Sequence, residues 1–215
     1  MKKRRLLPMI LAAALSLSLA SCGSIPTSDT VDPDTFVTEQ ITSTDTSYEW
    51  NEIPWYTTKK EVAKKMKEHT LYLDEGDMLH YTQNKTLTDG TPVKTKLSFG
   101  FTDATDDGEL AGIRWVFLLE DSEKANQLFQ SLRQQMEPWM ETDNYHGMPD
   151  ETMTVMNKES GSYLDLRVMS SDTTTEPMWW SEYPEELWDP FSEVALFIWF
   201  PEDRLELMQN HANSN

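Results

Sequence analysis

Residues 110–138 have the sequence LAGIRWVFLLEDSEKANQLFQSLRQQMEP, and this stretch decides the fold class. In its first ten residues, apolar side chains alternate along one face of a strand and also occur on the other face. The first set is Ile113, Trp115, Phe117 and Leu119, and the second is Val116 and Leu118. Because successive side chains of a strand point to opposite faces, the pattern predicts a central strand buried on both sides over 110–119.

The rest of this stretch has the periodicity of a helix. Apolar residues recur every three or four positions and Pro138 follows them, which predicts a helix over 122–137. The apolar positions are Ala125, Leu128, Phe129, Leu132 and Met136. Upstream, Thr58 and Glu61 have the spacing of a capping box, so a second helix is predicted from there to about His69.

The remaining periodic segments predict strands and an α+β domain. Polar and apolar residues alternate over 93–101, as in a strand with one buried face. Other strands are predicted at 71–73, 78–83, 152–156, 163–169 and 194–200. Short connections favour antiparallel pairing, and helices beside such a sheet pack on one face. We therefore expect a single two-layer domain over 48–210, with an antiparallel sheet of about six or seven strands, two main helices on one face, and a frayed tail at 211–215.

The chain begins with a charged start, an apolar run and a cysteine. Four basic residues follow Met1, an apolar run covers 6–20, and small residues precede Cys22. The run is shorter than the roughly 20 residues of a spanning helix, so a secretory signal peptide is predicted. Residues 19–22, Leu-Ala-Ser-Cys, resemble the lipobox of bacterial lipoproteins.

This resemblance implies cleavage after residues 1–21 and attachment of a diacylglycerol to Cys22. Two acyl chains give stable anchoring, so we expect a protein held on the outward face of the cell membrane. The alternative is an ordinary signal peptide whose mature product happens to begin with a cysteine. Cys22 is the only cysteine in the chain, which excludes an intramolecular disulfide, a thiolate zinc site and a separate catalytic thiol.

The net charge limits the possible partners, and the composition of residues 22–47 indicates where the folded part begins. Removal of the four basic residues of the signal segment changes the formal charge from −19 to −23, which disfavours nucleic acid and anionic headgroups as partners. Residues 22–47 are rich in Ser, Thr, Asp and Pro, a composition typical of a flexible tether. Phe36, Val37 and Ile41 are exceptions that could dock as a short strand.

A second resemblance covers short motifs of the mature domain. Residues 53–62, IPWYTTKKEV, together with LAGI at 110–113 and YHGMP at 145–149, are similar to small bacterial envelope lipoproteins of uncharacterised activity that begin with IPWG-T/S-x-x-E-V. The chain departs from this pattern at Tyr56, where glycine is usual, and by His146 between Tyr145 and Gly147. The resemblance implies an α+β fold and carries over no catalytic residue.

Motif analysis identifies no catalytic residues, metal site or cofactor. The chain has no Gly-x-Ser-x-Gly elbow, no pair of histidines at helical spacing and no Gly-rich phosphate loop. The acidic residues Asp103, Asp106, Asp107 and Glu109 could offer oxygen ligands to calcium. Their order does not match an EF-hand loop, so a solvated hairpin is the favoured interpretation.

One segment combines aromatic and acidic residues in a long connection before the last strand. Within 179–191 we predict a ligand-binding surface made by Trp179, Trp180, Tyr183 and Trp188. The competing interpretation, which the eight tryptophans of the chain favour, is that the same side chains cap the open face of the sheet.

The predicted anchor and tether, together with the lack of a catalytic motif, favour a non-enzymatic envelope lipoprotein. We expect it to bind or assemble with an envelope protein or glycan. One alternative is a cell-wall-directed hydrolase that uses carboxylates such as Glu182 and Glu185. A further alternative is a small solute-binding lipoprotein, although such receptors usually close two lobes on a ligand.

Overall fold

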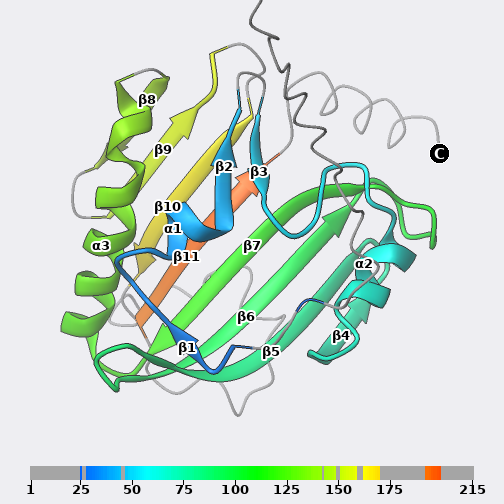
Figure 1. Cartoon of the computed structure of the whole chain (residues 1–215), viewed down its shortest axis with the longest axis horizontal. Helices are drawn as coiled ribbons and strands as arrows, with labels where there is room; N and C mark the ends of the chain where they lie inside the picture. Colours follow the sequence, from blue (N-terminus) through cyan, green and yellow to red (C-terminus); the bar gives the residue numbers. More distant parts are fainter. Residues whose placement is uncertain are drawn as a thin grey trace, which may run out of the picture.

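A computed structural model describes residues 25, 28–44, 47–141, 143–148, 151–158, 162–169 and 192–199. Figure 1 shows these residues as a large sheet with helices packed on it. The α+β class predicted from the sequence is confirmed.

The described strands form one nine-stranded mixed sheet and one two-stranded sheet. The large sheet has the order β1-β5-β6-β7-β11-β10-β9-β8, and β4 also pairs with β5. Its strands are β1 Thr30–Val31, β4 Thr70–Glu75, β5 Met78–Leu87, β6 Pro92–Phe101, β7 Leu110–Leu119, β8 Asn144–Met148, β9 Thr152–Met156, β10 Tyr163–Met169 and β11 Ser192–Trp199. The short edge strand β1 runs parallel to β5, whereas the other pairs are antiparallel. The prediction of an antiparallel sheet of about six or seven strands is therefore corrected to a mixed sheet of nine described strands. The two additional strands, β1 and β8, arise from segments without a strand pattern.

Strand β7 lies inside the sheet, as its two apolar faces predict. Ile113, Trp115 and Phe117 belong to the main core. On the other face, Val116 and Leu118 pack in a small cluster with Ala195 and half-buried Phe197 of β11.

Helix α3, Ser122–Met140, covers part of the sheet. It contacts β7, β9, β10 and β11, and its buried residues are the five apolar positions that the sequence predicted. The helix continues past the predicted end, and Pro138 lies inside its last turn. Trp139 and Met140 still pack against the core, which gives a physical reason for this extension.

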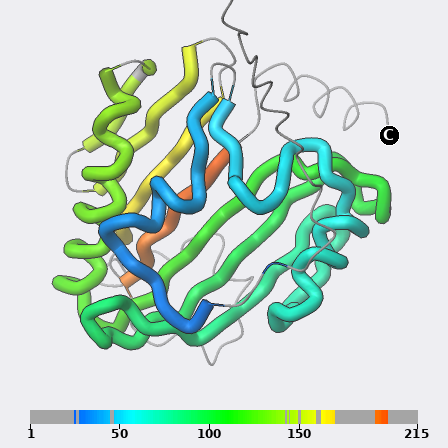
Figure 2. The backbone as a smooth tube through the Cα atoms, in the orientation of Figure 1, coloured from blue at the N-terminus to red at the C-terminus, as the bar shows by residue number. Residues whose placement is uncertain are grey.

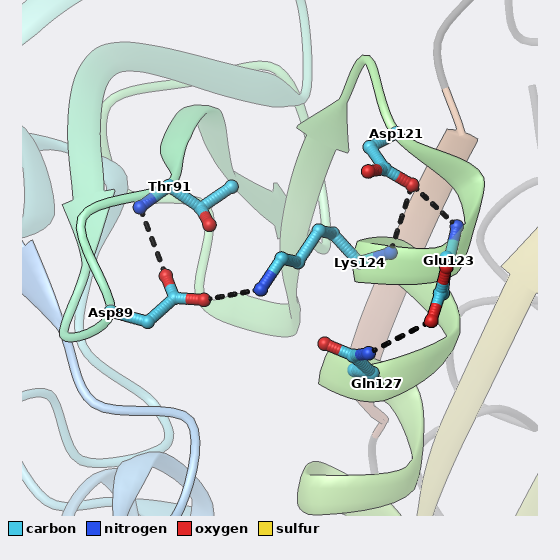
Figure 3. Close-up of polar contacts among 6 residues, drawn as sticks. All are labelled: Asp89, Thr91, Asp121, Glu123, Lys124 and Gln127. Atoms are coloured by element: carbon cyan, nitrogen blue, oxygen red, sulfur yellow. Dashed lines mark hydrogen bonds and ion pairs between the residues drawn. The ribbon is translucent and has the colours of Figure 1, made fainter.

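The first turn of α3 is also tied to the β5–β6 turn, as Figure 3 shows. Lys124 Nζ donates to Asp89 at 2.6 Å, and the other oxygen of that carboxylate accepts the N–H of Thr91. Asp121 caps the helix by accepting the N–H groups of Glu123 and Lys124. The hydrogen bond from Lys124 is the main cause of the lowered pKa of Asp89. Because the pair is exposed to solvent, it orients the turn more than it stabilises the domain.

Helix α2, Lys59–Lys65, begins with the predicted capping box. The hydroxyl of Thr58 accepts the N–H of Glu61, and the carboxylate of Glu61 accepts the N–H of Thr58. Just before this helix, Tyr56 has a φ of 69°, in the left-handed region that favours glycine. Tyr56 is the only described residue other than glycine with a positive φ, so its backbone carries local strain.

The segment expected to be a flexible tether is folded over residues 28–44, so that prediction is wrong there. It forms β1, the short helix α1 (Phe36–Gln40) and strand β2 (Ile41–Ser43), which pairs with β3 (Tyr48–Trp50). Val31, Val37 and Ile41 are buried in the main core. Although the composition of the segment resembles that of disordered chains, these few apolar side chains pack into the main core. The folded domain therefore begins upstream of residue 48.

Gln135 of α3 holds this segment in place. Its side-chain oxygen accepts the N–H of Val37 at 2.8 Å, and its nitrogen donates to the carbonyl of Pro33 at 2.6 Å. The side-chain amide of Gln135 thus binds the backbone both just before α1 and in its first turn. This helix is too short to be stable alone.

We expect Gln135→Met to loosen residues 28–44, because it removes both hydrogen bonds while keeping the side-chain volume. The free energy of unfolding should fall by about 1–2 kcal/mol, and the amide of Val37 should exchange faster. Hydrogen exchange and denaturant unfolding would measure both effects. The matched control is Gln134→Met, because Gln134 is exposed on the same helix. Equal behaviour of the two variants would contradict the role of Gln135.

Candidate ligand pocket

The residues predicted to bind a ligand, Trp179, Trp180, Tyr183 and Trp188, lie outside the described residues, as do Cys22, Glu182 and Glu185. Among the described residues, the structure points instead to a cavity between the 28–40 segment and the sheet. None of the helices in the described ranges is long and apolar enough to cross a bilayer.

This pocket has a volume of about 270 Å³ and lies where the N-terminal segment crosses strands β5, β6 and β7. Figure 2 shows that segment as the blue tube in front of the green strands. Half-buried Phe36 and Leu97 contribute apolar surface, and the buried residues Trp50, Tyr81 and Trp115 also line the pocket. The polar lining residues, which we call the rim, are Ser28, Thr30, Asp32, Glu39, Gln40, Glu52, His69, Gln83, Lys85, Thr95 and Lys96.

The aromatic rings of the pocket are fixed by mutual packing. Phe36 meets Trp115 edge-on at 6.1 Å, and Trp50 meets the same ring edge-on at 5.4 Å. Trp50 also stacks on Phe99, and its indole N–H donates to Gln40 at 2.9 Å. Such pairs hold ring positions beyond simple burial, so the apolar side of the pocket is preformed.

His69 joins the pocket rim to the beginning of the described chain. Its Nε2 lies 3.1 Å from the carbonyl of Ile25, and its Nδ1 lies 2.7 Å from the side-chain nitrogen of Gln83. Since a carbonyl only accepts, Nε2 carries the hydrogen and Nδ1 accepts from Gln83, which is the arrangement of a neutral imidazole. Burial is the main cause of the lowered pKa of His69.

Lys85 places a cation at the same rim. Its side chain is half-buried, and burial lowers its pKa, with Asp29 acting in the opposite direction. Within the described ranges no carboxylate forms a salt bridge with Lys85. Burial also raises the pKa of neighbouring Tyr81 to about 12, so this phenol stays protonated at neutral pH. A ligand with an anionic group would compensate the partly desolvated ammonium of Lys85.

The acidic turn proposed as a calcium alternative is placed between β6 and β7. The carboxylate of Asp103 accepts the N–H and the hydroxyl of Thr105, and the carbonyl of Asp106 accepts the N–H of Lys60. Across the described ranges, no group of three or more His, Cys, Asp or Glu side chains is arranged to hold a metal ion. The carboxylate of Asp103 therefore shapes the turn.

The opposite face of the sheet carries charged side chains that the sequence analysis did not single out. Arg114 donates to Glu193 at 3.1 Å, and Asp165 accepts from Arg167 and from the hydroxyl of Thr154. Glu193 and Asp165 are almost fully buried. Phe197 lies between Arg114 and Arg167, whose guanidinium carbons are 4.9 and 5.8 Å from its ring centroid. These contacts join β7, β11, β10 and β9, so they help to fix strand register.

No protein-family model, curated protein or solved structure matches this chain. The pocket could not be predicted from the sequence because eight of its 19 lining residues belong to the segment assigned to a tether. The available signal was the group of large apolar residues Phe36, Val37 and Ile41, because such residues are unusual in a flexible linker.

We expect the stability of the domain to fall as the pH drops below about 6.5, the ordinary pKa of histidine. The folded state holds His69 neutral, so the unfolded chain binds more protons and gains stability as the pH falls. Between pH 7.5 and 5.5 the loss in the free energy of unfolding cannot exceed about 1.4 kcal/mol, which corresponds to one proton over one pH unit. The actual loss is smaller, because solvent screens a half-exposed group.

Denaturant unfolding at the two pH values would measure this loss. The control is His69→Gln, which keeps a polar side chain but cannot titrate. An identical pH dependence in wild type and variant would show that His69 does not cause the loss.

Proposed function

We propose that this protein is a lipid-anchored bacterial envelope lipoprotein whose folded domain binds a small envelope component without catalysing a reaction. The observation that carries the binding role is the preformed pocket between residues 28–40 and the sheet. Aromatic and aliphatic surface lies on one side of it, and amide, carboxylate and ammonium groups lie around the rim.

The chemistry of the pocket favours a wall-glycan fragment that carries an acidic group. Sugar rings pack against apolar and aromatic side chains such as Phe36, while Gln83, Glu39 and Gln40 offer hydrogen bonds to hydroxyls. Lys85 supplies the partner for a carboxylate. The volume of about 270 Å³ suits one ring or one short side group.

The anchor belongs to the same proposal. A diacylated Cys22 after cleavage of residues 1–21 would hold the domain on the outward face of the membrane. We also infer a two-layer arrangement in which α1, α3 and the β2–β3 hairpin form one layer on the face of the sheet that contains the pocket. The contacts of α3 with four strands and of α1 with α3 support this arrangement.

The other candidate functions have less support. The hydrolase alternative depends on Glu182 and Glu185, which lie outside the described residues. A solute-binding receptor would need a second lobe to close on its ligand, and the described residues form one sheet-based body.

We expect Cys22→Ser to abolish membrane attachment. The substitution removes the only thiol that can carry the diacylglycerol, so the precursor should remain unprocessed and unacylated. Labelling with radioactive palmitate and fractionation of a bacterial host would measure this. Ser24→Ala is the control, because it changes a nearby hydroxyl and leaves the cysteine intact. Palmitate incorporation into Cys22→Ser would contradict the proposed anchor.

We expect Lys85→Met to weaken binding of acidic wall-glycan fragments by about ten-fold or more, because a charge-assisted hydrogen bond contributes roughly 1.5–3 kcal/mol. Neutral fragments with the same ring should lose little affinity. Titration followed by tryptophan fluorescence would measure the change, since Trp50 and Trp115 lie at the pocket.

The matched control is Lys158→Met, which removes an exposed lysine after β9, away from the pocket. Wild-type protein that binds neither acidic nor neutral fragments would contradict the glycan assignment. Equal loss in both variants would show a long-range charge effect in place of a contact.

A further inference from the structure

Helix α2 and the turn after it carry an exposed row of lysines. Lys60, Lys64 and Lys67 are all exposed and follow the spacing i, i+4, i+7, which places them along one side of a helix. Val62 and Met66 on the other side are buried. We call these three residues the lysine row. None of them forms a salt bridge with another described residue.

This row is a local exception in a strongly acidic protein. Five of the 14 basic residues beyond the signal segment occur within residues 59–67. Among the acidic neighbours, Glu61 caps the helix and also attracts Lys64, and Asp74 pairs with Lys59. Charges more than about 8 Å apart are largely screened at physiological salt, so a surface that touches α2 experiences the lysines more than the net charge.

The start of the described chain is fixed beside this helix. The N–H of Ile25 donates to the carbonyl of Lys65 at 2.9 Å, and the carbonyl of Ile25 accepts from His69. The side chain of Ile25 is buried. Three residue steps separate Ile25 from Cys22, and even a fully extended chain spans only about 10 Å over that length.

We propose that the lysine row is the face of the domain that contacts the anionic headgroups of the bilayer in which the Cys22 lipid is embedded. This inference rests on the proposed anchor. The short link holds α2 within reach of the headgroups, and three exposed ammonium groups complement their phosphates. The predicted tether of about 25 residues would have held the domain far from the bilayer, whereas a domain docked at Ile25 lies directly on it.

The test uses the acylated full chain reconstituted into vesicles. Because acylation occupies Cys22, the thiol introduced by Ala63→Cys is the only free one in the chain. Ala63 is exposed and lies between Lys60 and Lys64. A fluorophore on that thiol is compared with one introduced by Gln127→Cys on α3, at the other end of the sheet in Figure 1. Headgroup-nitroxide lipids quench whichever fluorophore lies near the membrane.

We expect the fluorophore at position 63 to be quenched more strongly than that at 127, and more in vesicles with phosphatidylglycerol than in pure phosphatidylcholine. Lys60→Gln, Lys64→Gln and Lys67→Gln together should reduce the preference for anionic vesicles, by up to about fivefold per lysine. The matched control combines Lys94→Gln, Lys124→Gln and Lys158→Gln, which remove the same charge elsewhere. High salt should act like the first triple variant.

Two results would overturn the inference, and they are distinguishable by mass spectrometry of Cys22. An unmodified Cys22 in the processed protein would overturn both the anchor and the contact with the membrane. An acylated Cys22 with equal quenching at positions 63 and 127, or with equal effects of the two triple variants, would overturn the membrane-facing role of the lysine row alone.

Discussion

The docking of residues 28–44 onto the sheet is the constraint on which the candidate site depends. Gln135 accepts from the start of α1, and Phe36 packs edge-on against Trp115 and Phe117. Without these contacts the face of β5, β6 and β7 would be open to solvent, and no cavity would exist there. The hydrogen bonds of Gln135 and the ring contacts of Phe36 thus create the pocket, because they hold a segment that has little intrinsic preference for structure against the sheet.

Sequence periodicity predicted those strands and helices whose buried face is recorded in the spacing of their own apolar residues. Strand β7, strands β9 and β10, and the buried face of α3 follow directly from apolar spacing, and the capping box of α2 follows from Thr58 and Glu61. In each case the side chains that decide the structure are neighbours in the sequence. The period of two or of 3.6 residues then records which side chains face the core.

The docked segment and the pocket could not be predicted in the same way, because their partners are distant in the chain. The hydrogen bond from Val37 to Gln135 spans 98 residues, and no local pattern records it. Composition assigned 22–47 to a tether by averaging over polar residues, yet a few buried side chains determined its conformation. The contact between Arg114 and Glu193 could not be predicted for the same reason, because each residue is a charged position in an otherwise apolar strand and its partner is distant in the chain.

Ile25 would be a structural element shared by the pocket and the proposed lipid anchor. Its side chain lines the pocket, its backbone is held by Lys65 and His69, and it is the described residue nearest to Cys22. Protonation of His69 opposes the observed contact with Gln83, since Nδ1 would become a donor facing a donor. A change at this histidine therefore acts both on the lining of the pocket and on the backbone of Ile25.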